Sequence, residues 1–155
     1  GAVILEPDGK PHAPWAARMH DILRPLASTM GDILEQGRAA ALIHGIDVRS
    51  WIVTEGDLAT YVVFKLNTVT EANLLGLEAL PLPVTDWTRH FNSETLAVIP
   101  PGSGKAAATD YLHAHLNADR GRPTLGFGDS LSDLAYMAQM DVQMIPSRSQ
   151  IAQTL

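Results

Sequence analysis

Cysteine is absent from the 155-residue sequence. Its absence excludes disulfide bonds and thiolate metal sites, so the fold must be held by packing alone, as is usual for proteins of the cytoplasm. No apolar run approaches the ~20 residues that span a bilayer, and the first residues do not have the pattern of a signal peptide. We therefore expect a cytoplasmic protein with no membrane partner.

Positive charge is also scarce: 11 lysines and arginines stand against 17 aspartates and glutamates, which gives a net charge of -6. The acidic excess is spread along the chain, and this excludes an obvious surface for nucleic acid or anionic lipid. With 46% hydrophobic residues, the chain is long enough to bury the core of one domain or two small ones. Homo-oligomerisation is left open.

Both ends of the sequence look cut. Residues 1–5 read as a strand without any preceding segment, and the chain stops just after the start of a helix predicted at residues 149–153. We therefore expect a fragment, or a chain from which segments are missing.

The pattern of residues 14–99 predicts alternating helices and hairpins. Apolar residues from Trp15 to Leu34 recur at helical spacing, and Pro25 should kink or split that helix. Runs rich in valine, isoleucine and aromatic residues at 47–54 and 59–67 predict a hairpin.

The same arrangement then repeats. Residues 70–80 predict a short helix, and residues 86–91 and 95–99 predict a second hairpin around the turn at 92–94. Residues 14–99 thus predict the order α-β-β-α-β-β. Such a layer covers one face of a sheet with helices and leaves the other face free.

Past the breaker residues 100–104 the pattern changes. A helix is predicted from 105 to about 117, then a buried-type strand at 124–127, a short helix, and another strand at 141–145. This order is typical of a parallel sheet covered by helices. The expected class is therefore α/β, and the expected parts are residues 1–13 (edge strand and turn), 14–95 (α+β domain) and 96–155 (parallel-sheet domain).

The loop Gly128-Asp-Ser-Leu-Ser-Asp133 is the first chemical signal. It follows a strand, which places Asp129 and Asp133 at the carboxyl edge of a sheet, where α/β proteins bind ligands. Carboxylate and hydroxyl oxygens suit magnesium, which commonly uses one or two protein carboxylates. The alternative is that Ser130 and Asp133 only cap a helix.

Lys105 is the second signal, because it lies in the first turn of its predicted helix, where the helix dipole disfavours a cation. An exposed lysine can occupy such a position at small cost, and this is the alternative explanation. Together, a lysine and a carboxylate-held magnesium ion would form a clamp for a phosphoryl group.

Residues 125–137 resemble the fourth motif of haloacid dehalogenase-type phosphatases, commonly Gly-Asp-(two residues)-Asn-Asp, and Lys105 resembles their third. Residues 14–95 are similar to the large C2B cap of the subgroup that contains sucrose-phosphate, trehalose-phosphate and mannosyl-phosphoglycerate phosphatases. Residues 96–155 would then be the carboxyl-terminal part of a Rossmann-like core.

The resemblance implies roles for individual residues and Mg²⁺ as cofactor. Asp129 would bind the metal, and Asp133 would act in catalysis and support the metal shell. Ser132 stands where the family usually has asparagine and would be a smaller ligand. Lys105 would neutralise the phosphate and the attacking carboxylate.

Two motifs of the family are not evident. Glu6-Pro-Asp8-Gly9 imitates the first motif, Asp-x-Asp-Gly, but it has glutamate in the place of the nucleophile. The longer side chain would misplace its carboxylate, and errors near ~1 Å are costly in catalysis. We therefore predict a hairpin for residues 1–12, with the true first motif upstream.

The resemblance also implies contacts to the substrate. Cap strands of such proteins read the leaving group of the substrate, although a solvated strand face would explain the same polar residues. Trp15, Trp51 and Trp87 are expected in the cap core, unless one of them is exposed and stacks on a sugar. The candidate phosphate or substrate contacts are Ser130, Lys65, Arg89, His90 and Asn92.

The leading hypothesis is a magnesium-dependent phosphatase that hydrolyses a small-molecule phosphate ester, a sugar phosphate, through an aspartyl-phosphate. Its nucleophile would lie outside this sequence, so the chain alone should be inactive. Two alternatives stay open: a non-catalytic relative that binds or regulates, and a phosphomutase or phosphotransferase using the same residues.

Overall fold

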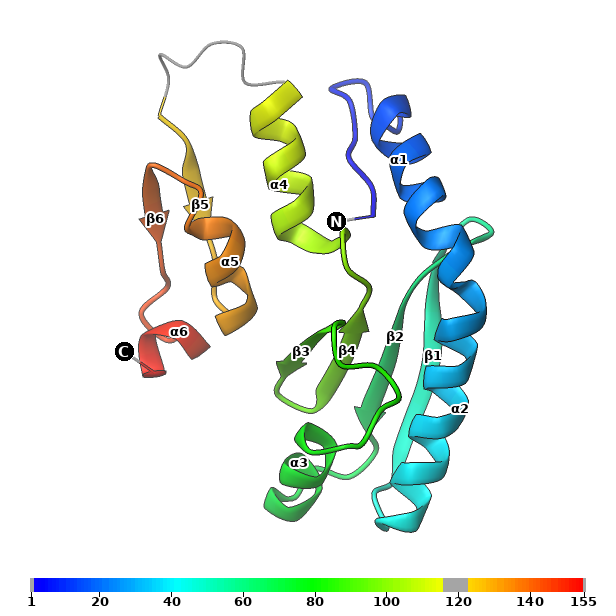
Figure 1. Ribbon diagram of the computed structural model, residues 1–155. Coiled ribbons are helices and arrows are strands. Elements are labelled where there is room, and N and C mark those ends of the chain that lie inside the picture. The colour runs from blue at the N-terminus through cyan, green and yellow to red at the C-terminus, as the bar shows by residue number, and fades with distance from the viewer. Residues whose placement is uncertain (1, 116–122, 155) are drawn as a thin grey trace. The chain divides into compact units, whose positions relative to one another are not determined.

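The computed structural model describes residues 2–115 and 123–154. It divides into two compact units, one formed by residues 16–102 and the other by residues 3–15 together with the described part of 103–154 (Figure 1). No helix within the described ranges is long and apolar enough to cross a membrane.

The first unit begins within α1, and this helical segment is broken at Pro25, as the sequence predicts. α1 (Ala13–Leu23) leads through the 3-10 turn η1 (Arg24–Leu26) into α2 (Ala27–Ile43). Proline has no N–H to continue the α-helical ladder, so the chain tightens here and starts again. The second helix runs further than its apolar pattern predicts, ending at Ile43 instead of Leu34.

A four-stranded antiparallel sheet completes this unit, with the strand order β1-β2-β4-β3 (Figure 1). Its strands form the two predicted hairpins, and α3 lies between the hairpins in the sequence. Thr70 caps α3 by accepting a hydrogen bond from the amide of Asn73. The bounds are β1 (Val48–Glu55), β2 (Leu58–Leu66), α3 (Glu71–Glu78), β3 (Thr88–Asn92) and β4 (Thr95–Ile99).

One face of the sheet carries the core of this unit. Val62, Phe64 and Val98 are completely buried there, and α2 packs against β1 and β2. The approach of α2 is close, because a Cβ atom built on Gly37 would lie 2.3 Å from the ring of Phe64. Glycine is therefore needed at position 37 for the helix to reach the sheet.

In the other unit, residues 4–12 form the predicted hairpin. Leu5 and Pro11 make an antiparallel bridge, and the amide of His12 donates to the carbonyl of Ile4 over 2.8 Å. Gly9 adopts a positive φ of 83° in the turn, a conformation that glycine reaches without strain.

The remainder of this unit has the predicted strand, helix, strand order, and β5 pairs with β6 in parallel. The predicted end of the first helix near residue 117 lies outside the described residues. The bounds are α4 (Gly104–His115), β5 (Leu125–Phe127), η2 (Leu131–Asp133), α5 (Leu134–Met137), β6 (Val142–Met144) and α6 (Gln150–Thr154).

The prediction that β5 is a buried strand is wrong for its side chains. Leu125 and Phe127 are 57% and 61% exposed, and their partners in register, Val142 and Met144, are exposed as well. A Cβ atom built on Gly126 would lie on the opposite face, close to the side chains of Met140 and Met137. Within the described residues, only that opposite face is covered, because two strands with a single helical layer cannot bury both sides.

Candidate functional site

The acidic loop after β5 is organised around the carboxylate of Asp133. Its Oδ2 accepts hydrogen bonds from the amides of Asp129 (3.1 Å) and Ser130 (3.2 Å) and from the hydroxyl of Ser130 (3.0 Å). Ser130 and Asp133 form a capping box at the start of η2. The helix-capping role that the sequence leaves open is therefore present.

The same carboxylate also holds Lys105. Nζ of Lys105, in the first turn of α4, lies 2.5 Å from Oδ1 of Asp133. The Asp133 side chain is only 3% exposed, whereas that of Lys105 is 60% exposed. The ammonium group thus has a buried anchor on one side and is open to a ligand on the other.

Burial alone would raise the pKa of Asp133. The hydrogen bonds from Lys105, Ser130 and Asp129 outweigh that effect and lower the pKa from 3.8 to about 2. Asp133 is therefore a carboxylate at neutral pH, and its negative charge balances the positive charge of Lys105. Since both of its oxygens are bonded to the protein, its geometry is that of a residue that positions others.

Asp129 is arranged differently. Its side chain is exposed. Its backbone is fixed, because its amide donates to Asp133 and its carbonyl accepts from the amide of Ile151 over 3.2 Å. The loop therefore presents one carboxylate outward from a fixed main chain.

Gly128 makes this geometry feasible. A Cβ atom at this position would lie 2.2 Å from Sδ of Met137 and 2.5 Å from Cβ of Asp133. No real side chain tolerates such contacts, so the close approach of α5 and the loop requires glycine.

The two serines of the loop lie in different surroundings. Ser130 is buried and its hydroxyl donates to Asp133, so the structure does not leave it available for phosphate. Ser132 is half-buried, and its Oγ lies 2.9 Å from Oγ of Ser130.

Tyr136 is a site residue that the sequence analysis missed. Its ring centre lies 5.9 Å from Nζ of Lys105, within range of a cation–π contact. Its hydroxyl donates to the carbonyl of Phe127 at the end of β5. The available signal was its spacing, because a residue three positions after Asp133 on a helix lies on the same side.

The oxygen ligands of this loop could supply part of a magnesium site. No group of three or more His, Cys, Asp or Glu side chains in the described residues could enclose a metal. Asp129 offers one exposed carboxylate, and Ser132 a hydroxyl nearby in the loop. Magnesium keeps several waters and often takes one or two protein carboxylates plus substrate phosphate, so these residues fit a hydrated ion.

The residues that imitate the first family motif are engaged within their hairpin. The carboxylate of Glu6 contacts Nδ1 of His12, and that of Asp8 lies 2.8 Å from Nζ of Lys10. His12 in turn lies 3.0 Å from the hydroxyl of Tyr111 on α4. The hairpin interpretation is confirmed, and Glu6 is a structural partner of His12.

The face of the four-stranded sheet opposite α2 carries a hollow of about 630 Å³. Residues from all four strands meet there in two rows, and the pair Val53 and Tyr61 of β1 and β2 lines it beyond them, because paired residues of antiparallel strands share a face. One row is polar and the other has small apolar residues between a tryptophan and a histidine. The rows are Arg49, Lys65, Thr95 and Asn92, and then Trp51, Val63, Ala97 and His90.

Three of the candidate substrate contacts, Lys65, His90 and Asn92, lie in this hollow. Arg89 does not. Its guanidinium donates to the carbonyls of Glu78 (2.7 Å) and Leu80 (2.9 Å) at the end of α3, on the helix-covered face. Strand alternation explains the difference, because neighbours along β3 point to opposite sides.

The tryptophans divide as the sequence analysis allows: Trp15 and Trp87 are buried, while Trp51 is 40% exposed in the hollow.

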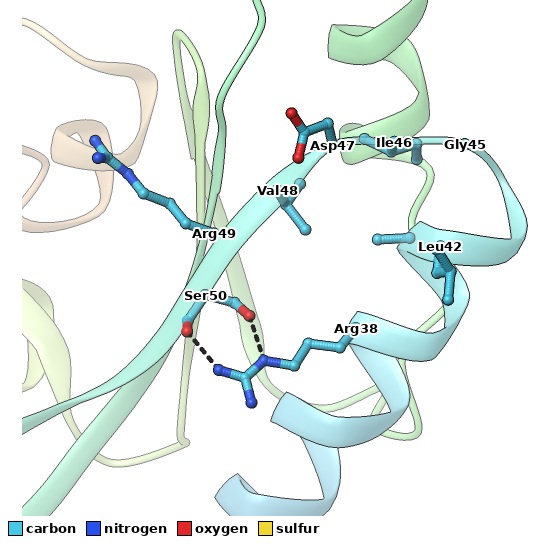
Figure 2. Close-up of a pocket in the computed structure, with 9 residues that line it drawn as sticks. Arg38, Leu42, Gly45, Ile46, Asp47, Val48, Arg49 and Ser50 are labelled. Carbon is cyan, nitrogen blue, oxygen red and sulfur yellow. Dashed lines mark hydrogen bonds between the residues drawn. The ribbon is translucent and has the colours of Figure 1, made fainter.

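The opposite side of β1 has another hollow, between the strand and the end of α2 (Figure 2). There Arg38 donates to the hydroxyl and the carbonyl of Ser50, which covers part of the strand's open edge. Figure 2 shows Arg49 extending away from this side.

No protein-family model matches the sequence, and no curated protein matches it. Among solved structures, the chain is similar to sucrose-phosphatase from Synechocystis, solved in complex with sucrose and phosphate, with a TM-score of 0.58 and 18% identity. The match covers 99% of this chain and 59% of that one. The likeness shows that the chain shares the fold of part of that structure, and this chain spans little more than half of the neighbour's length.

Proposed function

We propose that this chain carries the lysine and a magnesium-binding carboxylate of a phosphate monoester hydrolase of the haloacid dehalogenase type, acting on a sugar phosphate. The observation that carries the proposal is the contact between Lys105 and Asp133, 2.5 Å long, beside the outward carboxylate of Asp129 at the end of β5. A fixed cation can contact a phosphate dianion directly, and an open carboxylate can hold the Mg²⁺ ion that offsets the dianion's charge.

Lys105 would contact the phosphoryl oxygens. Its exposed ammonium can donate to them while Asp133 keeps it in place. In this role Asp133 is a positioning residue: one of its oxygens orients the lysine and the other fixes the loop. Tyr136 would support the same ammonium through its ring.

Asp129, with Ser132 nearby, would hold Mg²⁺. The ion, when bound, would offset charge on the phosphoryl oxygens. The chain's own contribution is to present the carboxylate from a loop whose main chain is fixed by Asp133 and by the amide of Ile151.

The attacking carboxylate would come from residues outside this sequence. Glu6 and Asp8 are held by His12 and Lys10 in the hairpin, which argues against either one as the nucleophile. An aspartyl-phosphate on a residue elsewhere in the parent protein remains our hypothesis for the reaction. The same observation favours one rival, a non-catalytic relative that binds phosphate without cleaving it.

Residues 16–102 would act as a cap of the C2B type. Their element order and antiparallel sheet support that proposal, as does the likeness to a sucrose-phosphatase structure that holds sucrose and phosphate. In this role the hollow over β1, β2, β3 and β4 would recognise the part of the substrate that leaves with the oxygen.

Binding of Mg²⁺ and inorganic phosphate to this chain tests the proposal without requiring the nucleophile. Backbone amide resonances of residues 128–133 should shift on addition of Mg²⁺, and Asp129→Asn should abolish the response. Asp141→Asn is the matched control, because Asp141 is another exposed carboxylate of the same unit and bonds Thr124 outside the loop. Equal Mg²⁺ responses in both variants would overturn the metal assignment.

Phosphate, added with Mg²⁺ present, should shift the amide of Lys105, and Lys105→Met should remove this response. Lys10→Met is the control, since Lys10 is an exposed lysine in the hairpin. Hydrolysis of a phosphate ester by a chain extended upstream, lost in its Lys105→Met variant, would support the hydrolase. Phosphate binding without hydrolysis in the extended chain would support the non-catalytic rival.

A further inference from the structure

β1 lies at one edge of the four-stranded sheet, where its second side faces no other strand of that sheet. The carbonyl of Asp47 accepts from the amide of Asn67 across the β1–β2 pair, whereas the carbonyl of Ser50 points the other way and accepts from Arg38. Main-chain groups of an antiparallel strand alternate between its two sides, so the even-numbered residues of β1 turn theirs to the edge. Such an edge can pair with a further strand.

Arg38 covers part of this edge without closing it. Its Nε donates to the hydroxyl of Ser50 over 2.9 Å, and its Nη2 donates to the carbonyl over 2.8 Å (Figure 2). A carbonyl oxygen has two lone pairs and can accept a second hydrogen bond from another strand. The next residue with outward main-chain groups is Ile52, further along the strand.

On the face opposite α2, β1 has a positive charge near its start and a negative charge at its end. Arg49 extends away from the helix side (Figure 2), and alternation places Glu55 on the same face as Arg49. The irregularity in the β1–β2 pairing skips Thr60 of β2, so the alternation along β1 continues past it. Both charged residues are exposed. A strand with this charge order is complementary to an antiparallel copy of itself.

Two β1 strands centred on Ile52 satisfy both ends at once. Arg49 of each copy then lies opposite Glu55 of the other, and Trp51 lies opposite Val53. These are non-hydrogen-bonded pairs, in which cross-strand side chains approach most closely. Opposite charges and pairs of an aromatic with a β-branched residue both stabilise a sheet, and two-fold symmetry makes each pair occur twice.

Neighbouring registers do not give this match. Two strands centred on Trp51 would place Glu55 opposite Asp47, and these like charges repel. Two strands centred on Val53 would overlap only from residue 51 to residue 55, which leaves Arg49 beyond the paired part of the strand. The charges therefore select the register centred on Ile52.

We propose that β1 is a dimer interface, which pairs antiparallel with β1 of a second copy of this chain and joins the two four-stranded sheets edge to edge. The centre of the interface is Ile52, and its two charge pairs are Arg49 with Glu55 of the other copy. The interface lies within residues 16–102. It uses neither Lys105 nor Asp129, so it does not depend on the proposed function.

Charge exchange tests the pairing by sedimentation equilibrium of the 155-residue chain. Phe127→Gln is present in every sample, because the exposed side of β5 offers a different contact between copies. The chain should dimerise with a Kd below about 1 mM. Arg49→Glu and Glu55→Arg should each raise the Kd about tenfold, because each turns two attractive pairs into two repulsive ones.

The two reversals combined in one chain should bring the Kd back to within about threefold of the starting value, since the pairs are then attractive again with exchanged signs. Asp21→Arg is the matched control. Asp21 is exposed on α1, and its replacement changes the net charge as much as Glu55→Arg does. The control should leave the Kd unchanged.

Cross-linking tests the register separately, because the sequence has no cysteine and an introduced thiol is the only one. Ile52→Cys would place two thiols at the two-fold axis, with Cα atoms about 5.5 Å apart, within the range of a disulfide. Thr54→Cys is the matched control, since its two copies would lie roughly 14 Å apart. Mild oxidation should therefore link the first variant and leave the second unlinked.

Three results would each overturn the proposal: a chain that is monomeric at about 1 mM, a double reversal that does not restore the Kd, or equal cross-linking at positions 52 and 54. The first result would leave this edge to an extended peptide of another protein. No metal or phosphate is added, so failure here is distinct from failure of the titrations that report on Asp129 and Lys105.

Discussion

Lys105 and Asp133 are 28 residues apart in the sequence, yet Nζ of the lysine lies 2.5 Å from Oδ1 of the aspartate. The carboxylate of Asp133 bonds the lysine through one oxygen and the Asp129–Ser130 main chain through the other. One buried anion thus sets the position of a cation and of a second carboxylate. Whatever disturbs Asp133 should therefore affect both halves of the proposed phosphate site.

Acid should weaken this arrangement in a defined pH range. The pKa of Asp133 is lowered from 3.8 to about 2 in the folded chain. The ionised carboxylate therefore stabilises the folded state fully above pH 3.8, and this stabilisation is lost as the pH falls through about 2. The linked free energy is about 2 kcal/mol. Urea unfolding between pH 2 and 6 should show this slope in the wild type and a reduced slope in Asp133→Asn.

Asp129→Asn is the control for that comparison, because its carboxylate is exposed. A slope in Asp133→Asn as steep as in the wild type would show that other groups carry the pH dependence.

Removal of the lysine should leave a nearly buried carboxylate with hydrogen bonds but no counter-charge. We expect Lys105→Met to lower the free energy of unfolding at pH 7 by about 2 kcal/mol and to raise the pKa of Asp133. In the double variant with Asp133→Asn, the two losses should not add. A double-mutant cycle from urea unfolding measures this coupling, and additive losses would contradict an interaction between the two groups.

Gly128 should not tolerate a methyl group. Because the added Cβ would lie 2.2 Å from Met137, Gly128→Ala should cost about 2 kcal/mol or more of unfolding free energy through overpacking. Gly31→Ala is the control: Gly31 lies in α2, and a Cβ added there would meet nothing within 4 Å, so alanine should stabilise the helix by up to about 1 kcal/mol. Thermal unfolding of both variants checks the opposite signs.

Much of the fold follows from local patterns in the sequence. Pro25 splits the first helix for covalent reasons, and both hairpins follow from β-branched runs around short turns. The proximity of Lys105 to Asp133 was also predictable, because both the motif and the helix dipole require a partner for that lysine.

The sequence gives less information where side-chain direction or neighbouring elements decide. Arg89 is a charged residue of the type that often contacts ligands. Strand alternation turns its side chain toward the carbonyls at the end of α3. Tyr136 went unnoticed because an aromatic residue on a short helix is ordinarily a core residue. The exposure of β5 depends on which elements cover it, and periodicity within one strand contains no information about that.

The exposed side of β5 and β6 should make the chain associate with itself. Leu125, Phe127, Val142 and Met144 form a continuous apolar surface in register, and such surfaces promote contacts between molecules. Phe127→Gln should therefore lower the apparent mass at high concentration in sedimentation or light scattering. Leu75→Gln is the control, because Leu75 is also 61% exposed but lies on α3 in the other unit. Equal reductions in both variants would mean that general hydrophobicity, not this surface, drives association.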